Sequence, residues 1–120
     1  MGDDIYFYKA GYDSWNAKYI VDELEMLVGK EGALPVIQGP KTFSSPLKIM
    51  EAELKANKVN YNNNPILRWC LTNAKVNIDR NDNLSLVKTS KATKRIDGVA
   101  SMMDAFIVYE GDKDNYLNML

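Results

Sequence analysis

The sequence predicts a single α/β domain over residues 1–120, and three observations support this fold class. Short apolar runs of the kind found in buried strands occur at residues 5–12 and 34–38. Three longer segments space their apolar residues as amphipathic helices do. Two alternating segments flank a polar, turn-rich stretch at residues 79–83, a pattern typical of a β-hairpin. The expected order is therefore strand, helix, strand, helix, helix, hairpin, helix.

The N-terminal third is expected to hold two strands joined by a helix. Residues 5–12 are rich in aromatic and β-branched side chains and predict a largely buried strand. A helix is expected over residues 15–28, with Ser14 as its N-cap. Its apolar face is formed by Trp15, Tyr19 or Ile20, Leu24, and Leu27 or Val28. Residues 34–38, which precede Gly39-Pro40, predict the second strand.

The remaining two thirds are expected to be mostly helical, with the hairpin between the helices. Ser45-Pro46 has the order of an N-cap and a first helical residue, so a helix is expected from there to about residue 57. Pro65 opens a short helix that carries Cys70, and residues 74–78 and 84–87 form the hairpin. The last helix covers residues 96–109, and the tail after Gly111 is expected to be a frayed helical turn. The inward face of this last helix consists of Ile96, Val99, Ala100, Met103, Phe106 and Ile107.

The absence of histidine and the single cysteine exclude several kinds of chemistry. Ser-His-Asp and Cys-His catalysis are excluded, and so is a zinc site with histidine ligands. Cys70 lies between Trp69 and Leu71 and is expected to be a core residue, which suits a reducing cytoplasm. A metal bound by this chain must therefore be a hard cation on oxygen ligands, namely Mg²⁺, Mn²⁺ or Ca²⁺.

Charge and hydropathy narrow the range of partners. The net charge of −1 and the pI near 5.4 do not suit a globally basic nucleic-acid binder, so any DNA affinity must come from a local patch. No apolar stretch reaches the roughly 18 residues that a membrane span needs. The first residues do not have the pattern of a signal peptide, which predicts a cytoplasmic protein without a membrane segment.

Asp13 and Asp97 are the candidate metal-binding and catalytic residues, because each lies where a buried element meets solvent. Asp13 ends the first strand, and Asp97 begins the last helix. A purely structural role is open for both: Asp13 as a cap of the next helix, and Asp97 as a favourable charge at a helix N-terminus. Asp104 lies on the same helical face as Asp97; a supporting polar role at the site is open for it, but we expect it to be solvated.

Four basic residues precede Asp97 and are the candidate DNA-binding residues: Lys88, Lys91, Lys94 and Arg95. Their alternative role is that of an ordinary solvated loop. Cations next to a carboxylate metal site suit a phosphodiester substrate, since phosphate contacts supply most sequence-independent affinity for DNA.

Several strings in this order resemble the nuclease part of tailed-phage terminase large subunits, and the resemblance covers residues 5–110. The strings are Gly11-Tyr12-Asp13-Ser14-Trp15-Asn16-Ala17, Val36-Ile37-Gln38-Gly39, Ser44-Ser45-Pro46-Leu47-Lys48, Asn64-Pro65-Ile66-Leu67-Arg68-Trp69, Asn73-Ala74-Lys75-Val76, Asn81-Asp82-Asn83-Leu84, Lys88, and Lys94-Arg95-Ile96-Asp97-Gly98-Val99-Ala100.

The resemblance implies an RNase H-like fold and a metal-dependent endonuclease that cuts concatemeric phage DNA while an attached ATPase domain drives packaging. It implies three acidic residues around two Mg²⁺ or Mn²⁺ ions, with Asp13 matching the second and Asp97 the third. The hairpin at 74–87 and Lys88 match a segment that lies near the active site and approaches DNA. Double-stranded DNA is the main implied partner, with the portal or the small terminase subunit as a further one, in the cytoplasm of a bacterial host.

The sequence departs from the family pattern at its N-terminal side. The family's first acidic residue lies on an upstream central strand, and Met1 to Asp4 do not resemble that strand. We therefore expect the C-terminal part of a phage or prophage terminase, without the ATPase domain and the first nuclease strands, and weak or absent cleavage by this chain alone. The alternatives are a non-catalytic DNA- or portal-binding remnant and another RNase H-like nuclease such as a Holliday-junction resolvase. The apolar strand at 5–11 would have an open edge, which predicts self-association through it.

Overall fold

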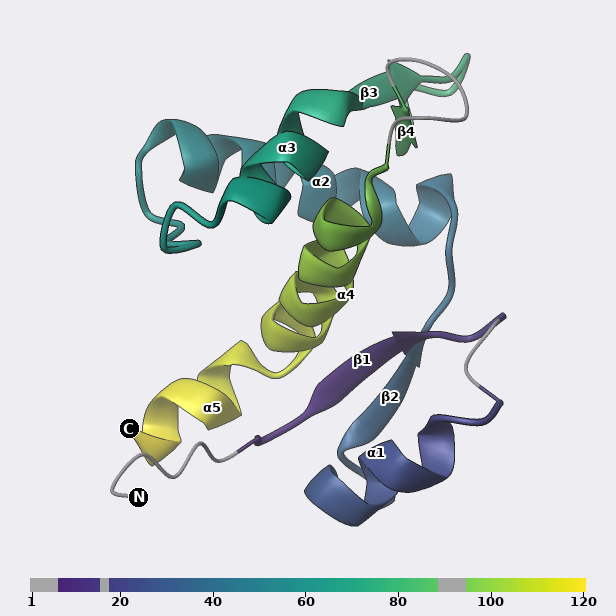
Figure 1. The fold of residues 1–120 in the computed structure, drawn as a ribbon, viewed down its shortest axis with the longest axis vertical. Helices are drawn as coiled ribbons and strands as arrows, with labels where there is room; N and C mark the ends of the chain where they lie inside the picture. The colour runs from purple at the N-terminus through teal and green to yellow at the C-terminus, as the bar shows by residue number, and fades with distance from the viewer. Residues whose placement is uncertain (1–6, 16–17, 89–94) are drawn as a thin grey trace.

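The long helix α4 (Asp97–Gly111) occupies the centre of the fold in the computed structural model, which describes residues 7–15, 18–88 and 95–120 (Figure 1). On one side of α4 lie β1 (Ala10–Asp13), α1 (Val21–Val28) and β2 (Ala33–Val36). On the other side lie α2 (Pro40–Lys55), α3 (Pro65–Asn73), β3 (Ala74–Ile78) and β4 (Leu84–Lys88). Helix α5 (Lys113–Met119) follows α4. The predicted α/β class is thus confirmed.

The strands of the described residues form two separate pairs. β1 and β2 are parallel, in a register that places Asp13 opposite Val36, and α1 lies in the connection between them. β3 and β4 form the predicted antiparallel hairpin, with Ala74 opposite Lys88. Parallel strands normally lie inside larger sheets covered on both faces, whereas β1 has β2 as its one hydrogen-bonded neighbour in the described part of the chain.

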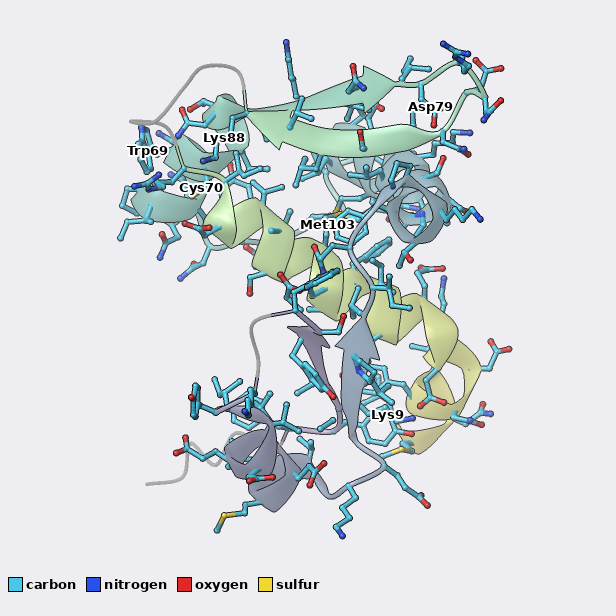
Figure 2. All side chains as sticks on the ribbon, turned by 90° about the vertical axis from the view of Figure 1, so that its right-hand side faces the viewer. Lys9, Trp69, Cys70, Asp79, Lys88 and Met103 are labelled. Atoms are coloured by element: carbon cyan, nitrogen blue, oxygen red, sulfur yellow. The ribbon has the colours of Figure 1, made fainter. Side chains whose placement is uncertain are left out.

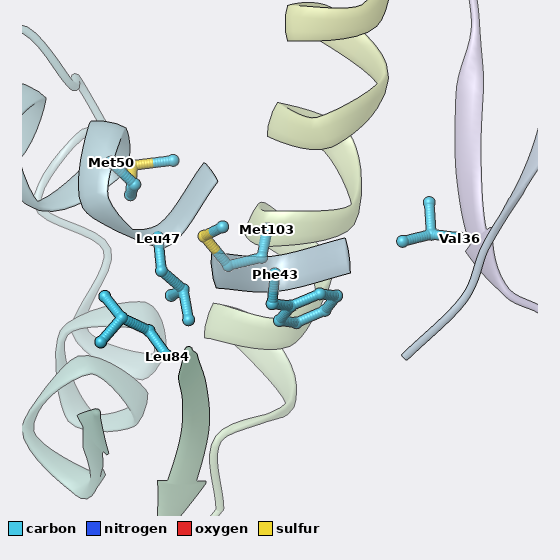
Figure 3. Packing of buried hydrophobic residues seen from close by; sticks show 6 residues of the cluster. All are labelled: Val36, Phe43, Leu47, Met50, Leu84 and Met103. Atoms are coloured by element: carbon cyan, nitrogen blue, oxygen red, sulfur yellow. The ribbon is translucent and has the colours of Figure 1, made fainter. Parts of the chain in front are cut away.

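The core lies where α2, α4 and β4 meet, and its central residue is Met103, which has no exposed surface (Figure 3). Val36 belongs to the same buried cluster and brings the β1–β2 pair to α4. The other members are Phe43, Leu47, Met50 and Leu84. The predicted inward face of α4 is confirmed for Val99 and Met103, which are buried, and Cys70 is buried as expected.

The helix expected over residues 15–28 is shorter than predicted, since α1 begins at Val21. Trp15 and Tyr19, expected on its buried face, are 80% and 89% exposed. Asp13 is the physical reason, because its Oδ1 accepts a hydrogen bond from the backbone N–H of Trp15 at 2.9 Å. This bond closes a turn directly after β1 and competes with a helix start at Ser14. The N-cap of α1 is Ile20, which makes no side-chain capping bond.

Three further element boundaries differ from the prediction. β1 spans residues 10–13 rather than 5–12; residues 7–9 are not strand, and residues 5–6 lie outside the described part. α2 begins at Pro40, which takes the first-turn position that proline favours, so Pro46 lies inside the helix rather than at its start. The tail forms the helix α5, because Tyr116 packs against the rings of Tyr8 and Tyr109.

Candidate functional site

Asp13 lies at the end of β1, where it is half-buried. Its carboxylate binds the backbone of Trp15 in the turn described above, so it caps that turn and not a helix. In the β1–β2 pair it lies opposite Val36, two residues before Gln38. Asp13 is therefore at the carboxyl end of a parallel strand pair, an edge at which α/β proteins commonly bind ligands.

Asp97 is the first residue of α4, and its side chain is exposed. The N-cap residue, Ile96, makes no side-chain bond to the first-turn N–H groups. The carboxylate of Asp97 therefore supplies the negative charge that the positive end of the helix dipole favours. This stabilisation is compatible with a ligand role and does not require one.

Asp104 is buried, contrary to the expectation that it is solvated: only 8% of its surface is exposed. Gln38 explains how the carboxylate is tolerated, because its Nε2 donates to Asp104 Oδ1 at 3.1 Å and to the carbonyl of Val36 at 3.1 Å. Burial raises the pKa of Asp104, and the negative charge of Asp13 raises it further, while the Gln38 bond lowers it. Asp104 interrupts the apolar run from Met102 to Phe106, a signal that could have identified it.

β1 and α4 are in direct contact at Gly11. A Cβ atom at this position would lie 2.7 Å from the backbone carbonyl oxygen of Asp104 and 2.7 Å from Cγ2 of Val108. Only glycine permits this approach, which brings Asp13 near the middle of α4. Asp97 lies seven residues before Asp104, about 10 Å along the helix axis.

A small open cavity of about 160 Å³ lies between the end of β2 and the first turn of α4. Gln38 and Gly39 line it on the β2 side, and Ile96 and Ala100 line it on the α4 side. Of the lining residues, Ile96 directly precedes Asp97, and Gln38 lies two residues after Val36, the strand partner of Asp13. No group of three or more acidic, histidine or cysteine side chains suited to a metal ion occurs among residues 7–15, 18–88 and 95–120.

Lys88 and Arg95 are brought to the same end of α4 as Asp97. Lys88 ends β4 and pairs with Ala74, the residue after Asn73. Asn73 in turn donates from Nδ2 to the backbone carbonyl of Arg95 at 2.9 Å. Figure 2 shows Lys88 beside the α3 residues Trp69 and Cys70, and the hairpin turn with Asp79 at the opposite end. The other two basic candidates, Lys91 and Lys94, lie outside the described residues.

In the described part of the chain, no helix is long and apolar enough to cross a membrane.

Comparison with known proteins identifies a family. Residues 5–111 match the model of the terminase large subunit endonuclease domain. Protein YmfN of Escherichia coli (strain K12) is 30% identical over 71 residues, a match that covers 58% of this chain and 16% of YmfN. The matched segment is thus only about a sixth of that relative's length. No solved structure matches the chain.

Proposed function

Because the chain belongs to the terminase large-subunit endonuclease family, we propose that it forms part of the nuclease that cuts concatemeric DNA for a phage packaging motor. The observation that carries this proposal is the family match over residues 5–111, which includes both candidate carboxylates and the basic residues before α4. The complete nuclease fold is proposed to be RNase H-like. The proposed place of action is the cytoplasm of a bacterial host.

We propose metal-dependent hydrolysis with Mg²⁺ or Mn²⁺. The available donors fit a hard cation, since Asp13 and Asp97 offer carboxylate oxygens and the chain contains no histidine. A pair of such ions, when bound, activates the attacking water and stabilises the leaving oxygen. The chain's own contribution is to hold one carboxylate at the end of β1 and the other at the start of α4.

Lys88, Lys91, Lys94 and Arg95 are proposed to bind DNA phosphates next to these carboxylates. Lys88 and Arg95 lie at the α4 end that carries Asp97, so a phosphate held by them would be close to that carboxylate. Contacts of this kind fix the position of the duplex without reading its sequence. The portal and the small terminase subunit are further proposed partners.

Cleavage by this chain alone is proposed to be weak. The resemblance implies three acidic residues around the metal pair, and this chain offers Asp13 and Asp97 for two of them. With fewer carboxylates, both the negative charge and the number of ligands available to two dications are reduced. The lack of a three-residue metal cluster in the described segments supports this proposal.

A plasmid-nicking assay with Mg²⁺ or Mn²⁺ tests the function. We expect slow, metal-dependent nicking that is lost in Asp13→Asn and in Asp97→Asn. Asp22→Asn, an exposed carboxylate on α1, is the matched control and should leave the rate unchanged. Nicking that survives in both site variants would contradict the assignment of these residues, and fast nicking that both variants abolish would contradict the proposed weakness of the chain.

A non-catalytic DNA-binding role is the second candidate, and it is favoured by the absence of a three-residue metal cluster from residues 7–15, 18–88 and 95–120. A DNA-binding titration distinguishes the nuclease from the non-catalytic binding module. A binding module would retain DNA affinity in Asp13→Asn and lose it in Lys88→Glu, without nicking by any variant.

We further propose that a second copy of the chain pairs with the open edge of β1. The support is the two-stranded parallel sheet, in which β1 has β2 as its one neighbour in the described residues.

A further inference from the structure

The first turn of α4 carries Asp97 but lacks a cap of its own. Ile96, the N-cap residue, cannot accept a hydrogen bond through its side chain, and the structure shows none there. At this end of α4, the backbone N–H of Ala100 donates a helical hydrogen bond to the carbonyl of Ile96 at 2.9 Å. The position of Asp97 must therefore be fixed by neighbouring elements.

Asn73 makes a polar contact with the chain that enters α4. It is the last residue of α3 and is only 3% exposed. Its Nδ2 donates to the backbone carbonyl of Arg95 at 2.9 Å, two residues before Asp97. Because the amide of Asn73 is shielded from water, loss of this bond would leave buried polar groups without a partner.

A packing contact holds α4 on the other side of Asp97. A Cβ atom at Gly98 would lie 3.1 Å from Cδ1 of Leu67 and 3.3 Å from Sγ of Cys70. Both side chains belong to α3, so the two helices are in close contact at this point. The residues at 95 and 98, which flank Asp97, are thus both held by α3.

We propose that Asn73 is a positioning residue that fixes the carboxylate of Asp97. It anchors the backbone before α4, while the Leu67–Cys70 surface supports the helix just after Asp97. Asn73 also directly precedes Ala74, the partner of Lys88 in the hairpin. Asn73 therefore connects the strand pair that carries Lys88, the proposed phosphate-binding residue, to the backbone just before Asp97. The catalytic consequence rests on the proposed nuclease function, whereas the structural effect does not.

Amide hydrogen exchange on the full chain tests the structural effect. In Asn73→Leu, which has similar volume but no donor, protection of the Ala100 amide should fall about tenfold, the effect of one lost hydrogen bond. Amides in α2, which does not contact Asn73 through a hydrogen bond, should lose much less protection. Equal loss across α2 and α4 would show a general loss of stability and overturn the proposal.

Two further variants keep the test decisive. Thr72→Val removes a neighbouring side-chain hydrogen bond of α3, from Thr72 Oγ1 to the carbonyl of Trp69, but leaves the Arg95 carbonyl bonded, so it should spare Ala100 relative to Asn73→Leu. If Asn73→Leu does not fold, Asn73→Ser replaces it, because serine is smaller and its hydroxyl cannot span the same distance. Protection at Ala100 that stays normal in Asn73→Ser contradicts the proposal.

The nicking assay provides the functional readout. We expect Asn73→Leu to raise the Mn²⁺ concentration for half-maximal nicking about tenfold, with Thr72→Val close to wild type. An unchanged metal requirement, together with lost protection at Ala100, would mean that Asn73 orders the helix without affecting the site. If the wild-type chain shows no metal-dependent nicking, the proposed function fails, and the exchange pattern still decides whether Asn73 fixes the start of α4.

Discussion

At the scale of single residues, Asp104 combines burial with a carboxylate that accepts its one side-chain hydrogen bond among the described residues from the neutral amide of Gln38. The bond from Gln38 partly compensates the loss of water, and the nearby charge of Asp13 opposes ionisation. A carboxylate in such a place favours its protonated form in the folded protein. Asp104 therefore destabilises the fold when it is ionised, although it ties α4 to the end of β2.

Asp104→Asn should stabilise the chain at neutral pH. The pKa of Asp104 is raised on folding, so the stability that it contributes is full below the unfolded pKa of about 4 and is lost as pH rises through the folded pKa. Asparagine does not titrate and can still accept from Gln38. Thermal unfolding should show a higher Tm for the variant at pH 7 and a smaller difference at pH 3.5. A lower Tm of the variant at pH 7 would contradict this account.

Asp13 and Asp97 can be predicted as candidate site residues from the sequence because each marks an element boundary. The roles of Gln38 and Asn73 cannot be predicted in this way, because their hydrogen-bond partners lie 66 and 22 residues away in the chain. The burial of Asp104 was also missed. Its position depends on the close approach of β1 at Gly11, a tertiary contact that helical periodicity does not report.

At the scale of elements, α5 is held to the start of β1 by a cluster around Asp112. Tyr8 donates its hydroxyl to Asp112 Oδ2 at 2.6 Å, and Lys9 Nζ lies 3.3 Å from the same oxygen. The ring of Tyr116 packs against that of Tyr8. The hydrogen bond from Tyr8 is the largest cause that lowers the pKa of Asp112, followed by the bond from Asn115.

This cluster should weaken in acid. The pKa of Asp112 is lowered on folding, so its contribution is present above the ordinary value of about 4 and is lost as pH falls through the lowered folded pKa. A carboxyl NMR titration should show the pKa of Asp112 moving toward its ordinary value in Tyr8→Phe. Lys113→Ala, which leaves all these bonds in place, is the control. An unchanged Asp112 pKa in Tyr8→Phe would contradict the role of the tyrosine.

The hairpin and α4 could be predicted because their patterns are local: alternation around a polar turn, and apolar residues at helical spacing. The starts of α1 and α2 could not. Asp13 closes a turn that displaces the first expected start, and α2 begins at Pro40, where Gly39-Pro40 predicts only the end of the preceding strand. The first turn of α2 leads to Phe43, whose burial in the core is a tertiary contact that the local proline signal does not report.

At the scale of the whole molecule, the two sides of α4 differ in how well they are covered. The side with α2 and the hairpin holds most of the core, whereas the other side has a two-stranded sheet and a helix, α1, without a buried residue. Met26 and Leu27 on α1 are 86% and 65% exposed. On this side, β1 has β2 as its one hydrogen-bonded neighbour among the described residues, which leaves the edge proposed to pair with a second copy.

Self-association through the β1 edge should appear in light scattering as a rise in mean mass toward twice that of one chain as concentration increases. Phe7→Lys should shift this rise to higher concentration, because Phe7 is 60% exposed next to β1 and a lysine opposes strand pairing. Met26→Lys changes an equally apolar, exposed residue on α1 and is the matched control. A constant mass of one chain at high concentration would count against the proposal.

The contact at Gly11 has an evolutionary consequence. The gap between β1 and α4 is set on one side by a glycine and on the other by the carbonyl oxygen of Asp104 and by Cγ2 of Val108. Core side chains away from this contact can therefore be exchanged over generations without altering how far Asp13 lies from the helix. By contrast, the single substitution Gly11→Ala would push β1 away from α4 and would move the carboxylate of Asp13 with it. Gly11 should therefore tolerate little drift, although it bears no side chain.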